Sequence, residues 1–155
     1  MVATKVLPQL HLDNQLCFSV YTLSRLVTQA YQPMLTELGL TYPQYLAMLV
    51  LWQAQEEKQL PVPVRFLCER LVLDTGTMTP LLKRLEAAGL IERRRSADDE
   101  RVVLVELTTA GRQLRSRAAD VPASILCASH VSLDEAVALR EELQGLIRRW
   151  SAPEE

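Results

Sequence analysis

The sequence predicts a mainly α-helical protein with one small β-hairpin, and three observations lead to that fold class. Apolar residues recur every three or four positions through most of the chain, as on helices that bury one face. Residues 102–105 are instead a continuous β-branched and aliphatic run, with a second strand-like run shortly before it. The 155 residues (1–155) and the 48% hydrophobic content fit a single chain unit with its own core.

Two helices are expected in the first third of the chain. Asp13 or Asn14 can cap the first, whose apolar stripe consists of Leu16, Val20, Leu23, Leu26, Val27 and Ala30. This helix should weaken at Pro33 and end near Gly39, because proline breaks the hydrogen-bond ladder and glycine commonly closes a helix. The second helix should start at residues 41–43, where a proline suits the first turn, and reach about residue 55.

The middle of the chain predicts a second pair of helices and then the hairpin. Prolines at positions 61 and 63 precede a short helix over residues 64–71. A turn over residues 74–77 opens the next helix, which Gly89 closes and in whose first turn Pro80 would be tolerable. Residues 90–94 and 101–107 are the expected strands, and residues 95–100 form the polar loop between them.

Two helices are expected after the hairpin. Thr108 or Thr109 caps one that continues through Leu114. The apolar stripe of the last helix is Leu133, Val137, Leu139, Leu143, Leu146, Ile147 and Trp150. The first and last helices together carry more apolar surface than one chain can cover, which predicts a homodimer.

The order helix, turn, helix and hairpin is that of a winged helix-turn-helix. In this motif the second helix enters the DNA major groove, and the hairpin, here expected over residues 90–107, is called the wing. Residues 61–95 hold seven basic and four acidic residues, although the whole chain has a net charge of −2. Hydroxyls and cations donate to phosphates and base edges, so the candidate DNA contacts are Thr75, Thr77, Thr79, Lys83, Arg84, Arg94, Arg95 and Arg101, with Arg93 also expected on the wing. Taken alone, the threonines also fit a helix cap and the arginines a solvated surface. Their occurrence together, in the order of a winged helix-turn-helix, favours the interpretation as a DNA-binding surface.

Cys17 lies just inside the start of the first predicted helix, where the partial positive charge of the helix end favours the reactive thiolate. A buried apolar cysteine is the alternative. No secretory signal or membrane span is recognised, so we expect a cytoplasmic protein with no membrane partner and with reduced cysteines. The cysteine spacings and the positions of His11 and His130 match no metal site, and we expect neither metal nor cofactor.

The wing sequence Asp99-Glu100-Arg101, followed by Leu107-Thr108 and Gly111, resembles the MarR family of dimeric winged-helix repressors over residues 12–150. This resemblance implies that Asp99 orients Arg101 toward the minor groove. Residues 74–86 more specifically resemble the OhrR subfamily, repressors that sense organic hydroperoxides. The resemblance also implies dimerisation through residues 12–60 and 112–155, DNA binding through residues 61–111, and a pseudo-palindromic double-stranded operator.

The OhrR resemblance assigns roles to several residues around the thiol. Cys17, in the run Leu-Asp-Asn-Gln-Leu-Cys-Phe, matches the sensing cysteine, and Tyr31 and Tyr42 match the tyrosines that support its thiolate. Oxidation would give a sulfenic acid. Cys127 resembles the resolving cysteine of the two-cysteine branch, which forms a disulfide with the sensing cysteine of the other subunit. Tyr21 lies one helical turn beyond Cys17, and Cys68 is expected to be a packing residue.

The sequence therefore predicts a repressor, and not an enzyme, that releases operator DNA when an organic hydroperoxide oxidises Cys17. Two alternatives remain open. The protein could be a MarR-type repressor that a small phenolic ligand releases from DNA, with a merely structural Cys17. It could also be a thiol peroxidase, although catalysis would leave the basic helix and wing unexplained.

Overall fold

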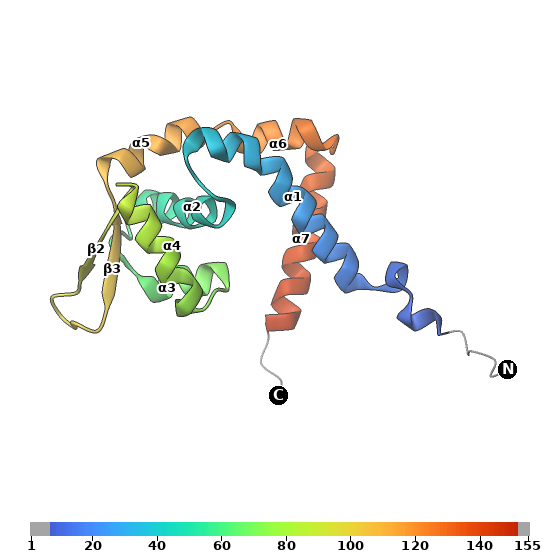
Figure 1. The fold of residues 1–155 in the computed structure, drawn as a ribbon, viewed down its shortest axis with the longest axis horizontal. Helices are drawn as coiled ribbons and strands as arrows, with labels where there is room; N and C mark the ends of the chain where they lie inside the picture. The colour runs from blue at the N-terminus through green and yellow to red at the C-terminus, as the bar shows by residue number, and fades with distance from the viewer. Residues whose placement is uncertain (1–6, 152–155) are drawn as a thin grey trace. The chain divides into compact units, whose positions relative to one another are not determined.

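The computed structural model describes residues 7–151, and the chain divides into two compact units, Met1–Ala118 and Ala119–Glu155. The elements of the first unit are two 3-10 turns, η1 (Pro8–Leu10) and η2 (Leu12–Asn14), then α1 (Leu16–Leu38), α2 (Tyr42–Glu56), β1 (Val62–Pro63), α3 (Val64–Leu71), α4 (Thr75–Ala87), β2 (Ile91–Arg95), β3 (Val103–Leu107) and α5 (Thr109–Ala118) (Figure 1). The second unit contains α6 (Val121–Ser129) and α7 (Leu133–Ser151). Within residues 7–151, no helix is long and apolar enough to cross a membrane.

The first helix starts later than predicted and ends where predicted. Neither Asp13 nor Asn14 caps α1, because both lie in η2, and the Asn14 side-chain amide donates to the Pro8 carbonyl instead. The helix continues through Pro33. It ends at Gly39, whose φ of 71° is the left-handed conformation that glycine adopts at low cost.

The second helix confirms the prediction and supplies much of the core. Thr41 and Gln44 form a capping box at its start, in which the Thr41 backbone N–H donates to the Gln44 side chain at 2.8 Å. Its buried residues are Tyr45, Ala47, Met48, Val50, Leu51, Trp52 and Ala54. Because they lie on more than one side of α2, this helix is enclosed by α1, α3, α4 and α5 rather than covered on a single face.

The helix-turn-helix forms as predicted, with one correction. Helices α3 and α4 pack together, and Asp74 caps the second, which Gly89 follows with a φ of 71°. Pro80 is the sixth residue of α4, so the expectation of a first-turn proline is wrong. The cap at Asp74 sets the helix start, and α4 therefore lacks the backbone hydrogen bond that a residue 80 N–H would donate.

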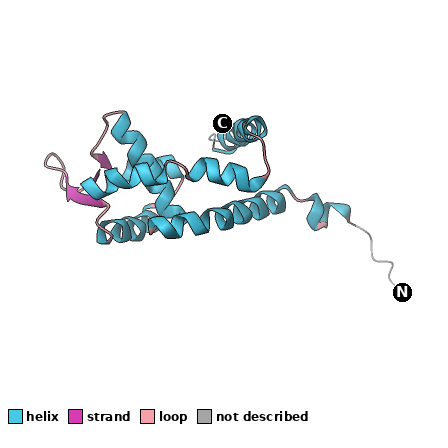
Figure 2. Ribbon diagram, turned by 90° about the horizontal axis from the view of Figure 1, so that it is seen from above, coloured by secondary structure: helices cyan, strands magenta, loops and turns pink. Residues whose placement is uncertain are grey.

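The sheet has three antiparallel strands in the order β1-β3-β2, where the sequence predicted two. The hairpin register pairs Arg93 with Val105, and the short β1 adds Val62 on the other side of Val105. Buried residues of this sheet, Val62, Ile91, Val105 and Leu107, complete the core formed with α2 and α4. Figure 2 shows the strands, in magenta, gathered at one end of the first unit.

Two long helices keep exposed apolar side chains. Helix α1 buries only Leu35 and exposes Leu16, Val20, Tyr21, Leu23 and Leu26. Helix α7 has no buried residue and exposes Leu133, Leu139, Ile147 and Trp150. Helix α6, which was not expected from the sequence, precedes it. The sequence predicts a dimer from these two apolar stripes.

Candidate DNA-binding surface and thiol site

The start of α4 is fixed by Asp74. Its carboxylate accepts hydrogen bonds from the Thr77 backbone N–H and the Thr77 hydroxyl, both at 2.8 Å. These bonds stabilise the charged carboxylate and lower the pKa of Asp74 below its ordinary value. The cap thus fixes where α4 begins and satisfies a backbone N–H group of its first turn.

Helix α4 buries Met78, Leu81, Leu82 and Leu85 on one side and presents its polar residues on the other. Thr75, Thr77, Lys83 and Arg84 are exposed, and Thr79 is half-buried. The hydroxyls of Thr77 and Thr79 already donate, to Asp74 and to the Thr75 carbonyl respectively, so toward DNA they are available as acceptors. Lys83 and Arg84 are the cations that α4 presents to solvent.

The wing holds Arg101 in place while leaving it accessible. Asp99 accepts three hydrogen bonds from Arg101: from the backbone N–H at 3.0 Å, from Nε at 3.1 Å and from a terminal nitrogen at 3.3 Å. The Arg101 side-chain bonds, and then its backbone bond, lower the pKa of Asp99. The Arg101 side chain is nevertheless 90% exposed. Arg94 and Arg95 are exposed on β2, and Arg95 donates to the Glu100 carbonyl at 2.7 Å.

Arg93 differs from the expected cluster of wing arginines, because it faces α4 rather than solvent. Its side chain is 20% exposed, and it forms an ion pair with Glu86 in which nitrogen and oxygen lie 2.5 Å apart. The Arg93 backbone N–H also donates to Glu86, at 3.1 Å. Arg93 lowers the pKa of Glu86 and ties the end of α4 to the hairpin.

A groove of about 490 Å³ separates α4 from the wing. Its walls include three of the predicted DNA-contact residues, Thr75, Thr79 and Arg101. Arg65, which is not among the DNA contacts predicted from the sequence, also lines the groove from α3, where it pairs with Glu69. Its place at the start of the first helix of the helix-turn-helix, next to the predicted recognition helix, is a sequence signal that could have identified it. The groove therefore combines hydroxyl and guanidinium groups from three elements.

The thiol site is only partly assembled within one chain. Cys17 is exposed at the second residue of α1. Tyr31 lies 14 residues further along the same helix, which corresponds to roughly 21 Å of helix axis. Tyr31 and Tyr42 do meet, with ring centroids 5.2 Å apart and edge to face. The predicted tyrosine pair is thus formed, but one chain cannot bring Tyr31 to its own Cys17.

The tyrosine pair consists of protonated phenols. Burial raises the pKa values of Tyr31 and Tyr42, and the neighbouring Tyr42 raises that of Tyr31 further. Tyr45 lies 5.8 Å from Tyr31, and burial with its two tyrosine neighbours raises the pKa of Tyr45 to about 12. Phenols that hold their protons are hydrogen-bond donors for an anion. Tyr21 is exposed and lies beside Arg25.

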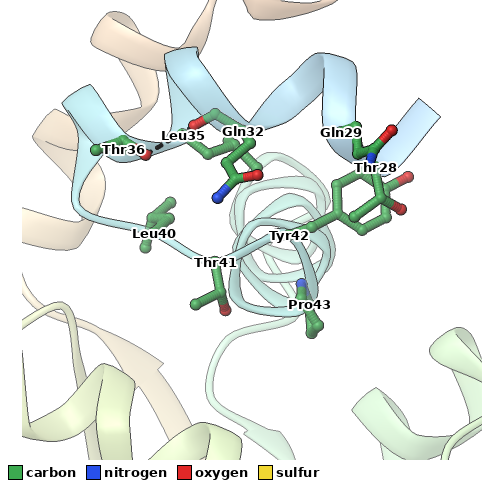
Figure 3. A pocket seen from close by; sticks show the side chains of 9 residues that line it. All are labelled: Thr28, Gln29, Gln32, Leu35, Thr36, Leu40, Thr41, Tyr42 and Pro43. Carbon is green, nitrogen blue, oxygen red and sulfur yellow. Dashed lines mark hydrogen bonds between the residues drawn. The ribbon is translucent and has the colours of Figure 1, made fainter. Parts of the chain in front are cut away.

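A cavity of about 380 Å³ lies next to Tyr42, between the second half of α1 and the start of α2. Figure 3 shows Thr28 and Gln29 beside the Tyr42 ring, with Gln32, Thr36 and Thr41 around the rest of the cavity. Leu35, Leu40 and Pro43 supply its apolar lining. No charged side chain lines it, so the cavity suits an uncharged molecule.

The other cysteines lie elsewhere. Cys127 is exposed on α6 in the second unit, and Cys68 is half-buried on α3, the environment expected of a packing residue. Among residues 7–151 there is no group of three or more His, Cys, Asp and Glu side chains that could hold a metal ion.

Comparisons with known proteins define the class. The profile described as "Transcriptional regulator SarA/Rot" matches residues 29–117. The organic hydroperoxide resistance transcriptional regulator of Bacillus subtilis (strain 168) is 46% identical over 136 residues, which cover 88% of this chain and 89% of that protein. The protein is therefore a winged-helix transcriptional regulator, and its relatives are regulators rather than enzymes.

Solved structures agree with this class. Reduced AbfR bound to DNA is 35% identical with a TM-score of 0.73, covering 94% of this chain and 97% of that one. Disulfide-formed AbfR is also 35% identical, with a TM-score of 0.63 and coverage of 92% and 94%; AbfR comes from Staphylococcus epidermidis. The chain belongs to the MarR/SarA family of transcriptional regulators and is of the OhrR type.

Proposed function

We propose that this regulator is a repressor whose DNA binding is controlled by organic hydroperoxides through Cys17. The thiolate of Cys17 attacks the outer peroxide oxygen, the O–O bond breaks, and a proton completes the alcohol that leaves. Cys17 is oxidised to the sulfenic acid and the hydroperoxide is reduced. The observation that carries the proposal is the exposed Cys17 at the N-terminus of α1, in a chain 46% identical to an organic hydroperoxide resistance regulator.

The thiolate site is completed by a second copy of the chain. Because Tyr31 lies roughly 21 Å along α1 from Cys17, the phenols that support the thiolate are Tyr31 and Tyr42 of the partner subunit. Their raised pKa values keep them as donors. The exposed apolar stripes of α1 and α7 supply the homodimer interface, so residues 12–60 and 112–155 are the dimerisation region.

Cys127 resolves the sulfenic acid. The thiol of Cys127 of the partner subunit attacks the Cys17 sulfur, a disulfide forms and water leaves. Both thiols are exposed, and the similar protein AbfR is known in a reduced DNA-bound form and in a disulfide form. The disulfide changes the spacing of the two DNA-binding regions, and the dimer leaves the operator.

Residues 61–111 of each subunit read the DNA. Helix α4 enters the major groove, where its contact residues are Thr75, Thr77, Thr79, Lys83 and Arg84. Arg101 of the wing, oriented by Asp99, enters the minor groove. Arg94 and Arg95 lie near the DNA backbone. Two such units bind half-sites roughly 34 Å apart, which makes the operator pseudo-palindromic. The protein works in the cytoplasm, where the DNA lies.

The test compares Cys17→Ser with the control Cys68→Ser. The reduced native protein first selects its operator from a random-sequence DNA library. All three proteins should bind that operator when reduced. Cumene hydroperoxide should release the native protein and Cys68→Ser but leave Cys17→Ser bound. Release of Cys17→Ser by the hydroperoxide would exclude Cys17 as the sensor.

A second candidate function rests on the uncharged cavity beside Tyr42. A small phenol bound there would displace α1 and α2 relative to each other, and the protein would release the operator without oxidation. The same assay separates the two candidates, because release by an uncharged phenol such as 4-methylphenol should be equal in the native protein and in Cys17→Ser. Insensitivity of both proteins to phenols would leave only the thiol mechanism.

A further inference from the structure

A continuous line of contacts joins the tyrosine cluster to the base of the wing. Tyr31, whose ring lies against Tyr42, is 5.8 Å from Tyr45, and Tyr45 is 6.5 Å from Trp52 in an edge-to-face arrangement. All these distances between ring centroids lie in the range of interacting aromatic pairs. Tyr45 and Trp52 are 2% and 4% exposed, so solvent does not separate them. The line thus runs through the core along α2.

Trp52 links α2 to α5. Its indole N–H donates to the carbonyl of Gly111 at 2.9 Å, and this hydrogen bond is buried. A buried donor that loses its acceptor is left without water to replace it, which makes the separation of the two groups costly. Trp52 and Gly111 must therefore move together or break a buried hydrogen bond.

Gly111 is in turn fixed to both ends of the wing hairpin. Its N–H donates to the Thr108 hydroxyl at 3.0 Å, and that hydroxyl donates to the Gly89 carbonyl at 2.7 Å. The Thr108 backbone N–H donates to the Leu90 carbonyl at 3.1 Å. Residues 89 and 90 precede β2, and Thr108 follows β3. A Cβ atom on Gly111 would lie 2.0 Å from the Leu90 oxygen, so this junction has no free space.

We propose that Trp52 is the positioning residue that couples the tyrosine cluster to the wing. A displacement of Tyr31 or Tyr42 moves the packed rings of Tyr45 and Trp52, and the buried hydrogen bond transfers that movement to Gly111 and the hairpin base. Packed interiors transmit such shifts because they have few voids to absorb them. This inference rests on the proposed function, since it names how the oxidation of Cys17 reaches the DNA-binding surface.

The test is Trp52→Phe, which keeps an aromatic ring beside Tyr45 but removes the N–H donor. Operator affinity is measured for reduced protein and for protein oxidised with cumene hydroperoxide. Trp52→Phe should bind the operator within about threefold of native affinity when reduced, and the ratio of reduced to oxidised affinity should fall at least about tenfold, or about 1.4 kcal/mol of coupling. The control is Leu51→Val, a buried change on the adjacent position of α2 that points to another side of the helix. It should leave the ratio unchanged.

A second readout follows the indole itself. In spectra of ¹⁵N-labelled native protein, the Trp52 indole resonance is the one that Trp52→Phe lacks, and it should shift when the hydroperoxide is added. If Trp52 were merely structural, Trp52→Phe would be less stable but would keep the native ratio of reduced to oxidised affinity, and the indole resonance of the native protein would not shift on oxidation. Either of these last two results overturns the coupling role. If the native protein itself keeps the operator after oxidation, the proposed function fails as well. If the native protein releases the operator and Trp52→Phe releases it to the same extent, the coupling role alone fails.

Discussion

Replacing Gly111 by alanine should destabilise the protein, although alanine ordinarily favours a helix. The new Cβ would lie 2.0 Å from the Leu90 carbonyl oxygen and 3.2 Å from a Leu107 methyl group. Since Cβ contacts under 3.0 Å are essentially never seen, α5 and β2 must separate by about 1 Å. That shift would stretch the hydrogen bonds that Thr108 at the start of α5 donates to the Leu90 and Gly89 carbonyls, now 3.1 and 2.7 Å, to about 4 Å and break them.

These effects give a net loss of about 2–4 kcal/mol. Overpacking costs about 1–3 kcal/mol and two lost hydrogen bonds cost about 1 kcal/mol each, while the helix propensity of alanine returns at most about 1 kcal/mol. Urea unfolding at one fixed protein concentration measures the change. The control is Gly145→Ala on α7, where the nearest atom lies 3.7 Å away and where stability should rise slightly. Equal or greater stability of Gly111→Ala would refute the reasoning.

Three further predictions concern DNA binding, acid stability and the disulfide. Arg101→Ala should weaken operator binding and reduce the slope of log affinity against log salt by about one; an unchanged slope would place the wing away from the DNA. Because Arg93 lowers the pKa of Glu86, this carboxyl stabilises the fold above the ordinary carboxyl pKa, and its contribution disappears as the pH falls through the lowered pKa. Urea unfolding should therefore show a shallower loss of stability below about pH 4 in Glu86→Gln than in the native protein. Equal losses in the two proteins would contradict this. After hydroperoxide treatment, Cys127→Ser should give no covalent dimer on non-reducing electrophoresis while Cys68→Ser gives one; a persistent dimer in Cys127→Ser would assign the resolving role elsewhere.

The sequence predicted most helices correctly because strong local signals mark them. Thr41 with Pro43, Asp74, Gly39 and Gly89 fix helix ends through hydrogen bonds and backbone angles that depend on nearby residues alone. Besides the short 3-10 turns η1 and η2, a strand and a helix were missed for a physical reason. Strand β1 consists only of Val62 and Pro63 and exists only through pairing with β3. Helix α6 lacks a polar and an apolar face whose periodicity could reveal it.

The candidate site was predictable where it depends on neighbouring residues, and less so where it depends on packing. The Asp99–Arg101 contact spans two positions and could be expected from the motif. The turn of Arg93 toward Glu86 could not, because it depends on how β2 docks against α4. The separation of Cys17 from Tyr31 was predictable, because both residues lie on the part of α1 that precedes Pro33, which the sequence predicts as one helix. The link from Trp52 to Gly111 joins residues 59 positions apart and has no sequence signal.

The most direct measurement of the central claim is a titration of the operator complex with cumene hydroperoxide, followed by fluorescence anisotropy of labelled DNA. If each Cys17 is the sensor, release should be complete near one equivalent of hydroperoxide per subunit, and dithiothreitol should restore binding. An operator complex that persists after many equivalents, or that dissociates equally in Cys17→Ser, would contradict the account.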